Sequence, residues 1–134
     1  ELNGITNELV TGAPSVRNVL LEFFRWLPND AILVAHNAFF AVESISLVLP
    51  TELTQDFLSL RVLDSVNVAK LIGVTKNNKL RTIALHFGWG DSVHRALPDS
   101  IVVSKLMQHA SSIGLFECFP EALQPACTAE VLHG

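Results

Sequence analysis

Cysteine is scarce in this sequence, with only Cys118 and Cys127 among 134 residues. Two cysteines exclude a disulfide framework and a cysteine-based metal site, and they indicate free thiols in a reducing, intracellular compartment. A long apolar run is also missing, because the best candidate, residues 31–42, is interrupted by His36 and Asn37. The sequence therefore predicts no membrane span.

Charge is equally sparse, at 16% of residues, with a net charge of -4 and a pI near 5.7. This balance excludes a protein that coats nucleic acid by bulk electrostatics, although a local basic groove stays compatible with it. With 49% hydrophobic residues the chain can bury a core, so we expect one folded domain over residues 1–134. The chain begins at Glu1 with neither methionine nor a signal peptide, which is typical of a fragment or processed piece.

Apolar periodicity predicts helices that alternate with short buried strands. Strands are expected at residues 31–35 and 61–63. Helices are expected at residues 14–27, 37–49, 52–58, 64–72, 79–87 and 94–113. This alternation indicates a layered α/β domain. Because two strands make a marginal sheet, we expect further strands from an upstream segment or from a second copy.

Asp99 stands out within the longest predicted helix, because it falls on the apolar face. The other members of that stripe are Val102, Val103, Leu106, Ala110 and Ile113. Burying an unpaired carboxylate costs several kcal/mol, so Asp99 needs a cation, a metal ion or strong hydrogen-bond donors. The alternative is an acid at the start of a helix, where the helix dipole favours it.

The stretch ILVAHNAFF, residues 32–40, runs from a predicted strand into two polar side chains. His36 and Asn37 either cap the next helix or line a binding pocket. On that helix Ala41 faces inward, whereas Glu43 faces solvent. Phe39 and Phe40, which precede Ala41, are expected in the core. The alternative is that they stack on bases of a bound strand.

Four segments in this order, LVAHNAFFA, LDSVNVAKLI, NKLRTIALHFG and HRALPD, resemble the DEDDh family of 3′-to-5′ exonucleases. The resemblance covers nearly the whole chain. It implies a ribonuclease-H-like, layered α/β/α fold that acts on 3′ ends of single-stranded DNA or RNA with Mg²⁺ or Mn²⁺. It also implies that His94 is the general base and Asp99 a metal ligand. His36, Asn37 and Phe40 would then contact the substrate.

The sequence departs from that family pattern at the carboxylates. The D-x-E strand would precede Glu1, and Ala41 stands where the second motif has an aspartate, so Asp99 alone remains of four. One carboxylate matches two divalent ions poorly, and we therefore expect impaired catalysis and no pair of ions in this chain alone. Three explanations stay open: an engineered Ala41, a natural pseudonuclease, or upstream strands supplied from elsewhere.

The C-terminal segment LFECFPEALQPACTAEVLH, residues 115–133, is similar to the tail of the exonuclease-like domain in promyelocytic leukaemia proteins and related stand-alone proteins. That resemblance implies a nuclear, non-catalytic module. Three hypotheses therefore remain at this point: an exonuclease, a protein- or nucleic-acid-binding scaffold, and a plain structural domain.

Overall fold

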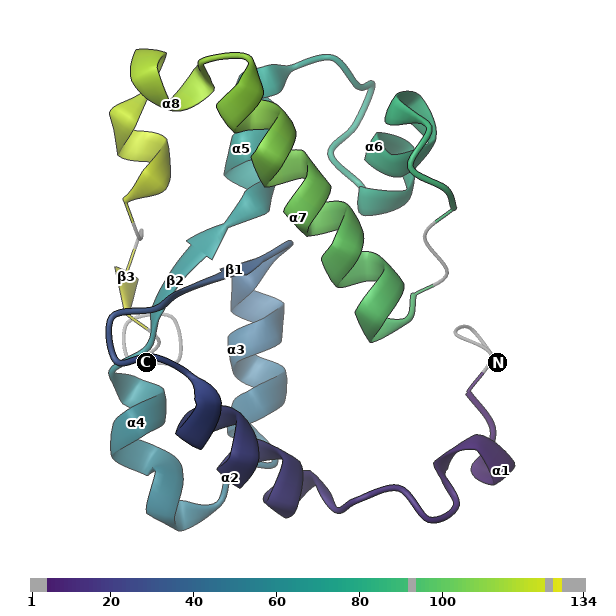
Figure 1. The fold of residues 1–134 in the computed structure, drawn as a ribbon, viewed down its shortest axis with the longest axis vertical. Helices are drawn as coiled ribbons and strands as arrows, with labels where there is room; N and C mark the ends of the chain where they lie inside the picture. The colour runs from purple at the N-terminus through teal and green to yellow at the C-terminus, as the bar shows by residue number, and fades with distance from the viewer. Residues whose placement is uncertain (1–4, 92–93, 125–126, 129–134) are drawn as a thin grey trace.

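The computed structural model describes residues 5–91, 94–124 and 127–128 of the chain (Figure 1). Its strands are β1 (Ile32–Ala35), β2 (Arg61–Asp64) and β3 (Cys127–Thr128). Its α-helices are α1 (Asn7–Val10), α2 (Val16–Trp26), α3 (Ala38–Ser46), α4 (Thr54–Leu58), α5 (Ser65–Ile72), α6 (Leu80–Phe87), α7 (Ala96–Ser112) and α8 (Leu115–Cys118). Two short 3-10 helices are η1 (Thr51–Leu53) and η2 (Pro120–Leu123).

The sheet has the order β1-β2-β3. Strands β1 and β2 run parallel, with Leu33 opposite Val62 and Ala35 opposite Asp64. Strand β3 pairs antiparallel with the other edge of β2. The third strand, which the apolar pattern did not predict, thus comes from the C-terminal segment of the chain itself. On its outer edge β1 has no strand partner among the described residues.

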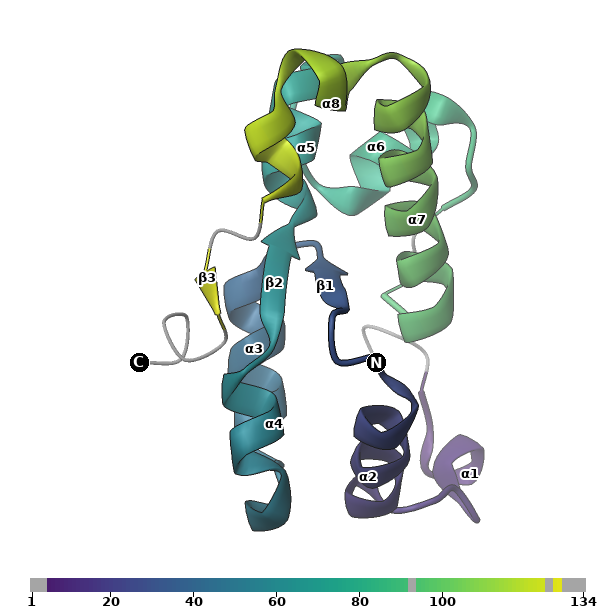
Figure 2. The same ribbon diagram turned by 60° about the vertical axis from the view of Figure 1, so that its left-hand side comes forward.

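Side chains of the two parallel strands alternate between two cores. Val34 and Leu63 face a cluster built by α5, α6 and α7, whereas Leu33, Ala35 and Val62 face one built by α3 and α4. The first cluster contains Val68, Ala69, Ile83, Leu106, Ala110 and Leu115. The second contains Ala38, Val42, Phe57 and Leu60. Helices α3 and α7 accordingly lie on opposite sides of β1 (Figure 2), which confirms a layered α/β domain.

Three predicted helices begin later than their apolar patterns indicated. Ser15 caps α2 by accepting the backbone N–H of Asn18, so the preceding proline lies outside the helix. Asn37 has φ 68° and His94 has φ 57°, both in the left-handed region. Helices α3 and α7 therefore start after them, because a left-handed residue interrupts the helical backbone.

Several aromatic side chains are exposed to solvent. Phe39 and Phe40 are 56% and 66% exposed, so the expectation that they are core residues is wrong. The opposite face of α3, with Ala38 and Val42, packs on the sheet instead. Trp26, at the end of α2, is likewise 75% exposed.

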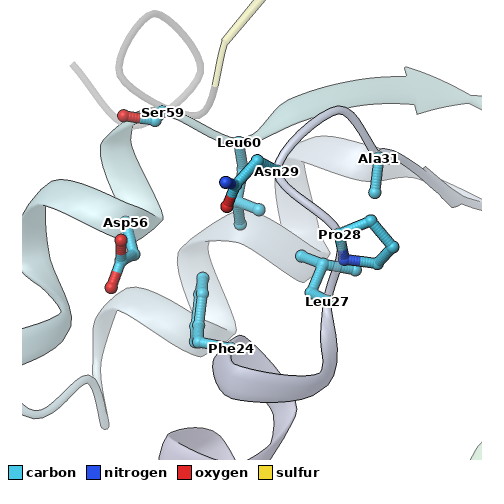
Figure 3. A pocket seen from close by; sticks show the side chains of 8 residues that line it. All are labelled: Phe24, Leu27, Pro28, Asn29, Ala31, Asp56, Ser59 and Leu60. Atoms are coloured by element: carbon cyan, nitrogen blue, oxygen red, sulfur yellow. The ribbon is translucent and has the colours of Figure 1, made fainter.

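A small hollow of about 90 Å³ lies at the amino ends of the parallel strands (Figure 3). Its lining comes from the end of α2, the connection to β1, and the segment from α4 to β2. The lining residues are Phe24, Leu27, Pro28, Asn29, Ala31, Asp56, Ser59 and Leu60. In parallel α/β sheets ligands bind at the carboxyl ends of the strands, so this hollow lies at the wrong end for a substrate.

No helix in the described ranges is long and apolar enough to cross a membrane.

Candidate functional site

Polar side chains gather where β1 and β2 end. His36 and Asn37 follow β1, while Asp64 closes β2 and Ser65 begins α5. The parallel register places Ala35 opposite Asp64, so these groups meet at one edge of the sheet. Sequence order alone separates them by nearly thirty residues, and the parallel pairing brings them together.

The Asp64 carboxylate holds the starts of two helices. Its Oδ1 accepts the backbone N–H groups of Asn37, at 3.0 Å, and Val66, at 2.9 Å. Its Oδ2 accepts the N–H of Ala38 at 3.0 Å. The Asn37 side chain makes no capping hydrogen bond, so the interpretation of Asn37 as the cap of α3 is wrong. Asp64 performs that task from the neighbouring strand.

The His36 ring connects β1 to α5 and to the segment before α6. Its Nε2 lies 2.6 Å from the backbone oxygen of Asn78, which only accepts, so Nε2 carries a hydrogen and donates it. In the neutral ring Nδ1 then accepts the hydroxyl hydrogen of Ser65 at 2.9 Å. Ser65 is fully buried. His36 is therefore held in one orientation by partners at both ring nitrogens.

The first of two hollows at this edge, the β1–α7 hollow, has a volume of about 300 Å³. It is lined by Val34, Ala35, His36, Leu80, Asp99, Ser100 and Val103. Asp99 is half-buried on the face of α7 that also carries the buried Val102 and Leu106. The structure thus brings His36 and Asp99 to one hollow. Ile113, at the end of the predicted stripe, is instead 53% exposed.

The second hollow, the lysine–asparagine hollow, has a volume of about 480 Å³ and shares His36 with the first. It is lined by His36, Asn37, Asp64, Val66, Asn67, Lys70, Asn78 and Lys79. Both hollows therefore open at the carboxyl ends of β1 and β2, where parallel sheets bind ligands.

The remaining predicted site residues line neither hollow. Phe40 is exposed on α3, and Ala41, one residue further, is half-buried. His94 is exposed just before α7. Sequence reasoning missed Ser100 and Leu80 in the first hollow, because neither residue type signals a site by itself.

The described residues do not fit a two-metal centre. Among them no group of three or more histidine, cysteine, aspartate or glutamate residues is arranged to hold a metal ion. Among the described residues that line the β1–α7 hollow, Asp99 is the one carboxylate, and both nitrogens of His36 already have partners. Magnesium and manganese require several oxygen ligands, which this lining does not supply.

Comparison with protein families decides the lineage. The exonuclease family of the RNase T type matches residues 1–107. The chain belongs to this exonuclease family. It is a DEDDh-type exonuclease domain, as the four sequence segments predicted.

Curated relatives of this exonuclease domain include bacterial DNA polymerase III proteins. The PolC-type DNA polymerase III of Oceanobacillus iheyensis is 33% identical over 109 residues, which cover 80% of this chain and 8% of the polymerase. The corresponding protein of Clostridium perfringens is 34% identical over 110 residues, 81% of this chain and 7% of that protein. The epsilon subunit of DNA polymerase III from Buchnera aphidicola is 25% identical over 112 residues, 79% of this chain and 48% of the subunit.

The chain thus spans less than a tenth of the length of the PolC-type relatives and about half of the epsilon subunit. No solved structure matches this exonuclease domain.

Proposed function

We propose that this exonuclease domain binds the 3′ end of single-stranded DNA or RNA in the β1–α7 hollow, and that its hydrolytic step is impaired. The observation that carries the proposal is the lining of that hollow, where Asp99 and His36 lie together with no second carboxylate from the described part of the chain. We further propose that the layered fold is ribonuclease-H-like, as in the family resemblance.

Each candidate residue has a distinct role in this proposal. Asp99 and His36 line the seat of the terminal nucleotide, and Asn37 lines the adjoining hollow. Phe40 projects an exposed ring from α3 on which a base stacks. His94 occupies the general-base position of the family, and its exposure leaves it accessible to a water molecule. Ala41 offers a methyl group where the family has a carboxylate.

Nuclease activity is tested directly with end-labelled single-stranded DNA and RNA in the presence of Mg²⁺ or Mn²⁺. We expect salt-sensitive binding without a cleavage ladder. His94→Ala and His86→Ala form a matched pair, because His86 is an exposed histidine on α6. A ladder that disappears in His94→Ala and persists in His86→Ala would establish an active enzyme. It would overturn the proposal that the hydrolytic step is impaired. If the protein neither cleaves nor binds these substrates, nucleic acid is excluded as its ligand.

The open edge of β1 leads to a proposal about partners. A strand from an upstream segment or from a second copy would extend the sheet there, since an edge that no described strand pairs presents backbone N–H and C=O groups. Sedimentation of the chain over a range of concentrations tests the second copy. A monomer throughout that range would exclude it.

The second candidate function is a binding or scaffolding module in the nucleus. Its support is the likeness of residues 115–133 to the promyelocytic leukaemia tail. Within that segment residues 125–126 and 129–133 lie outside the described residues. A fluorescently tagged chain expressed in cells should concentrate in the nucleus, and an even distribution would contradict this placement.

A further inference from the structure

The lysine–asparagine hollow combines two cations with three amides. Lys70 reaches it from α5, and Lys79 immediately precedes α6. The amides belong to Asn37, Asn67 and Asn78. In a chain of net charge -4, this lining has more cationic than anionic side chains. Primary amides donate two hydrogen bonds each, and ammonium groups donate three.

One carboxylate belongs to the same lining, but its oxygens are already engaged. Asp64 accepts three backbone N–H groups through both oxygens. Those contacts hold its carboxylate on the helix starts. Asp64 therefore weakens the attraction of the hollow for an anion without abolishing it.

Neither lysine forms an ion pair with a carboxylate of the described residues. Within the part of the chain that the structure describes, the ion pairs join Arg17 to Glu52 and Arg81 to Asp91. Both Lys70 and Lys79 are exposed. Their ammonium groups are thus available to an anion from solution.

The wall of the hollow is held in shape by its own hydrogen bonds. Thr75 donates its hydroxyl to the backbone oxygen of Asn77 at 2.6 Å, and the N–H of Lys79 donates to Asn77 Oδ1 at 3.0 Å. The backbone oxygen of Asn78 accepts from His36. A segment already ordered in this way loses little conformational entropy when a ligand binds.

We propose that the lysine–asparagine hollow binds a phosphate group, carried either by a nucleic-acid strand or by a free mononucleotide. Lysine binds phosphate as a point charge, and the amides add hydrogen bonds to its oxygens. A volume of about 480 Å³ accommodates a nucleotide-sized ligand. The strand source rests on the proposed function: because the two hollows share His36, a strand ending in the β1–α7 hollow presents a neighbouring phosphate to the lysines.

The strand source is tested by the salt dependence of oligonucleotide binding. Fluorescence anisotropy of a labelled single-stranded oligonucleotide is measured at several salt concentrations for wild type, Lys70→Gln, Lys79→Gln and the double variant. The slope of log K against log salt should fall by roughly 0.7 for each lysine removed. Lys105→Gln is the matched control, since Lys105 is an exposed lysine on α7 outside this lining, and its slope should equal that of the wild type.

The mononucleotide source is tested on the same proteins by NMR. Inorganic phosphate and a nucleoside monophosphate in the millimolar range should shift the side-chain amide signals of Asn67 and Asn78. The shifts should be lost in the double variant, whose circular dichroism should match that of the wild type.

The two experiments separate the two proposals. If the wild type binds no oligonucleotide but phosphate shifts these amides, the proposed function fails and the phosphate site stands. If the wild type binds oligonucleotide with an unchanged salt slope in both lysine variants, and phosphate leaves the amides unmoved, the phosphate site is wrong and nucleic-acid binding stands.

Discussion

Asp64 is a structural acid at the centre of the candidate site. Its carboxylate joins the starts of α3 and α5, so it fixes the backbone at the carboxyl ends of both parallel strands. The bond from the N–H of Val66 is local, because it joins groups two residues apart. The bonds to Asn37 and Ala38 depend on the parallel pairing of the strands, which no local pattern specifies.

Replacing Asp64 should therefore cost more than losing one helix cap. Asp64→Ala removes an acceptor from three backbone N–H groups, and we expect the free energy of unfolding to fall by about 2–3 kcal/mol. Urea denaturation measures this change. Glu43→Ala is the control, because Glu43 is exposed on α3, and it should change stability by less than about 0.5 kcal/mol. Equal effects of the two substitutions would show that the shared cap contributes nothing.

Phe40 is the residue whose interpretation changed most. Its exposed ring on α3 favours base stacking over the core position that composition indicated. Phe40→Ala should weaken oligonucleotide binding by about 1–3 kcal/mol, the range for one stacked base. Leu47→Ala, an 81% exposed apolar residue just after the same helix, should leave the affinity unchanged. A Phe40→Ala variant that binds as tightly as the wild type would remove stacking from the proposal.

At the scale of elements, α2 is attached by partly buried side chains and by one exposed ion pair. Phe24 and Leu27 pack against the core, but α2 contains no fully buried residue. Near its start Arg17 makes a two-pronged ion pair with Glu52 in η1. The hydrogen bond from Arg17 is the largest cause that lowers the pKa of Glu52 below its ordinary value of 4.5.

The sign of the resulting pH dependence follows from that lowered pKa. The pair stabilises the folded chain above the ordinary glutamate pKa, and this contribution is lost as the pH falls through the lowered pKa. Glu52→Gln should therefore destabilise the protein slightly at neutral pH and by less at a pH below the ordinary glutamate pKa. Urea denaturation at both pH values, in low and high salt, measures the difference, which high salt should reduce because both side chains are exposed. A difference of equal size at both pH values would contradict this account.

At the scale of the whole molecule, one small sheet separates two cores. Because Leu33 and Val34 face opposite sides, each core depends on the same two parallel strands. We therefore expect both cores to unfold together in one transition. The apolar stripe of α7 supplies the first core, although only part of the predicted stripe is buried.

Two substitutions test which part of the predicted α7 stripe is buried, one within α7 and one at its C-cap. Leu106→Ala should lower the free energy of unfolding by about 2–5 kcal/mol, because Leu106 is only 1% exposed. Ile113→Ala, at the predicted continuation of the stripe, should cost less than about 0.5 kcal/mol because Ile113 is more than half exposed. Thermal unfolding followed by circular dichroism and tryptophan fluorescence measures both variants. Equal losses would mean that burial does not distinguish the two positions.

Sequence alone determined the parts of this protein that depend on neighbouring residues. Apolar spacing located both parallel strands and placed Asp99 on the buried side of α7, and four ordered segments identified the exonuclease family. Tertiary structure alone decided which distant groups meet. The His36 ring is hydrogen-bonded to Ser65 and Asn78, which lie 29 and 42 residues further along the chain, and it lines two hollows. It also decided that Phe40 and Trp26 are exposed. The reason is physical: periodicity records which face of an element is apolar, whereas contact and exposure depend on what the rest of the chain packs against that face.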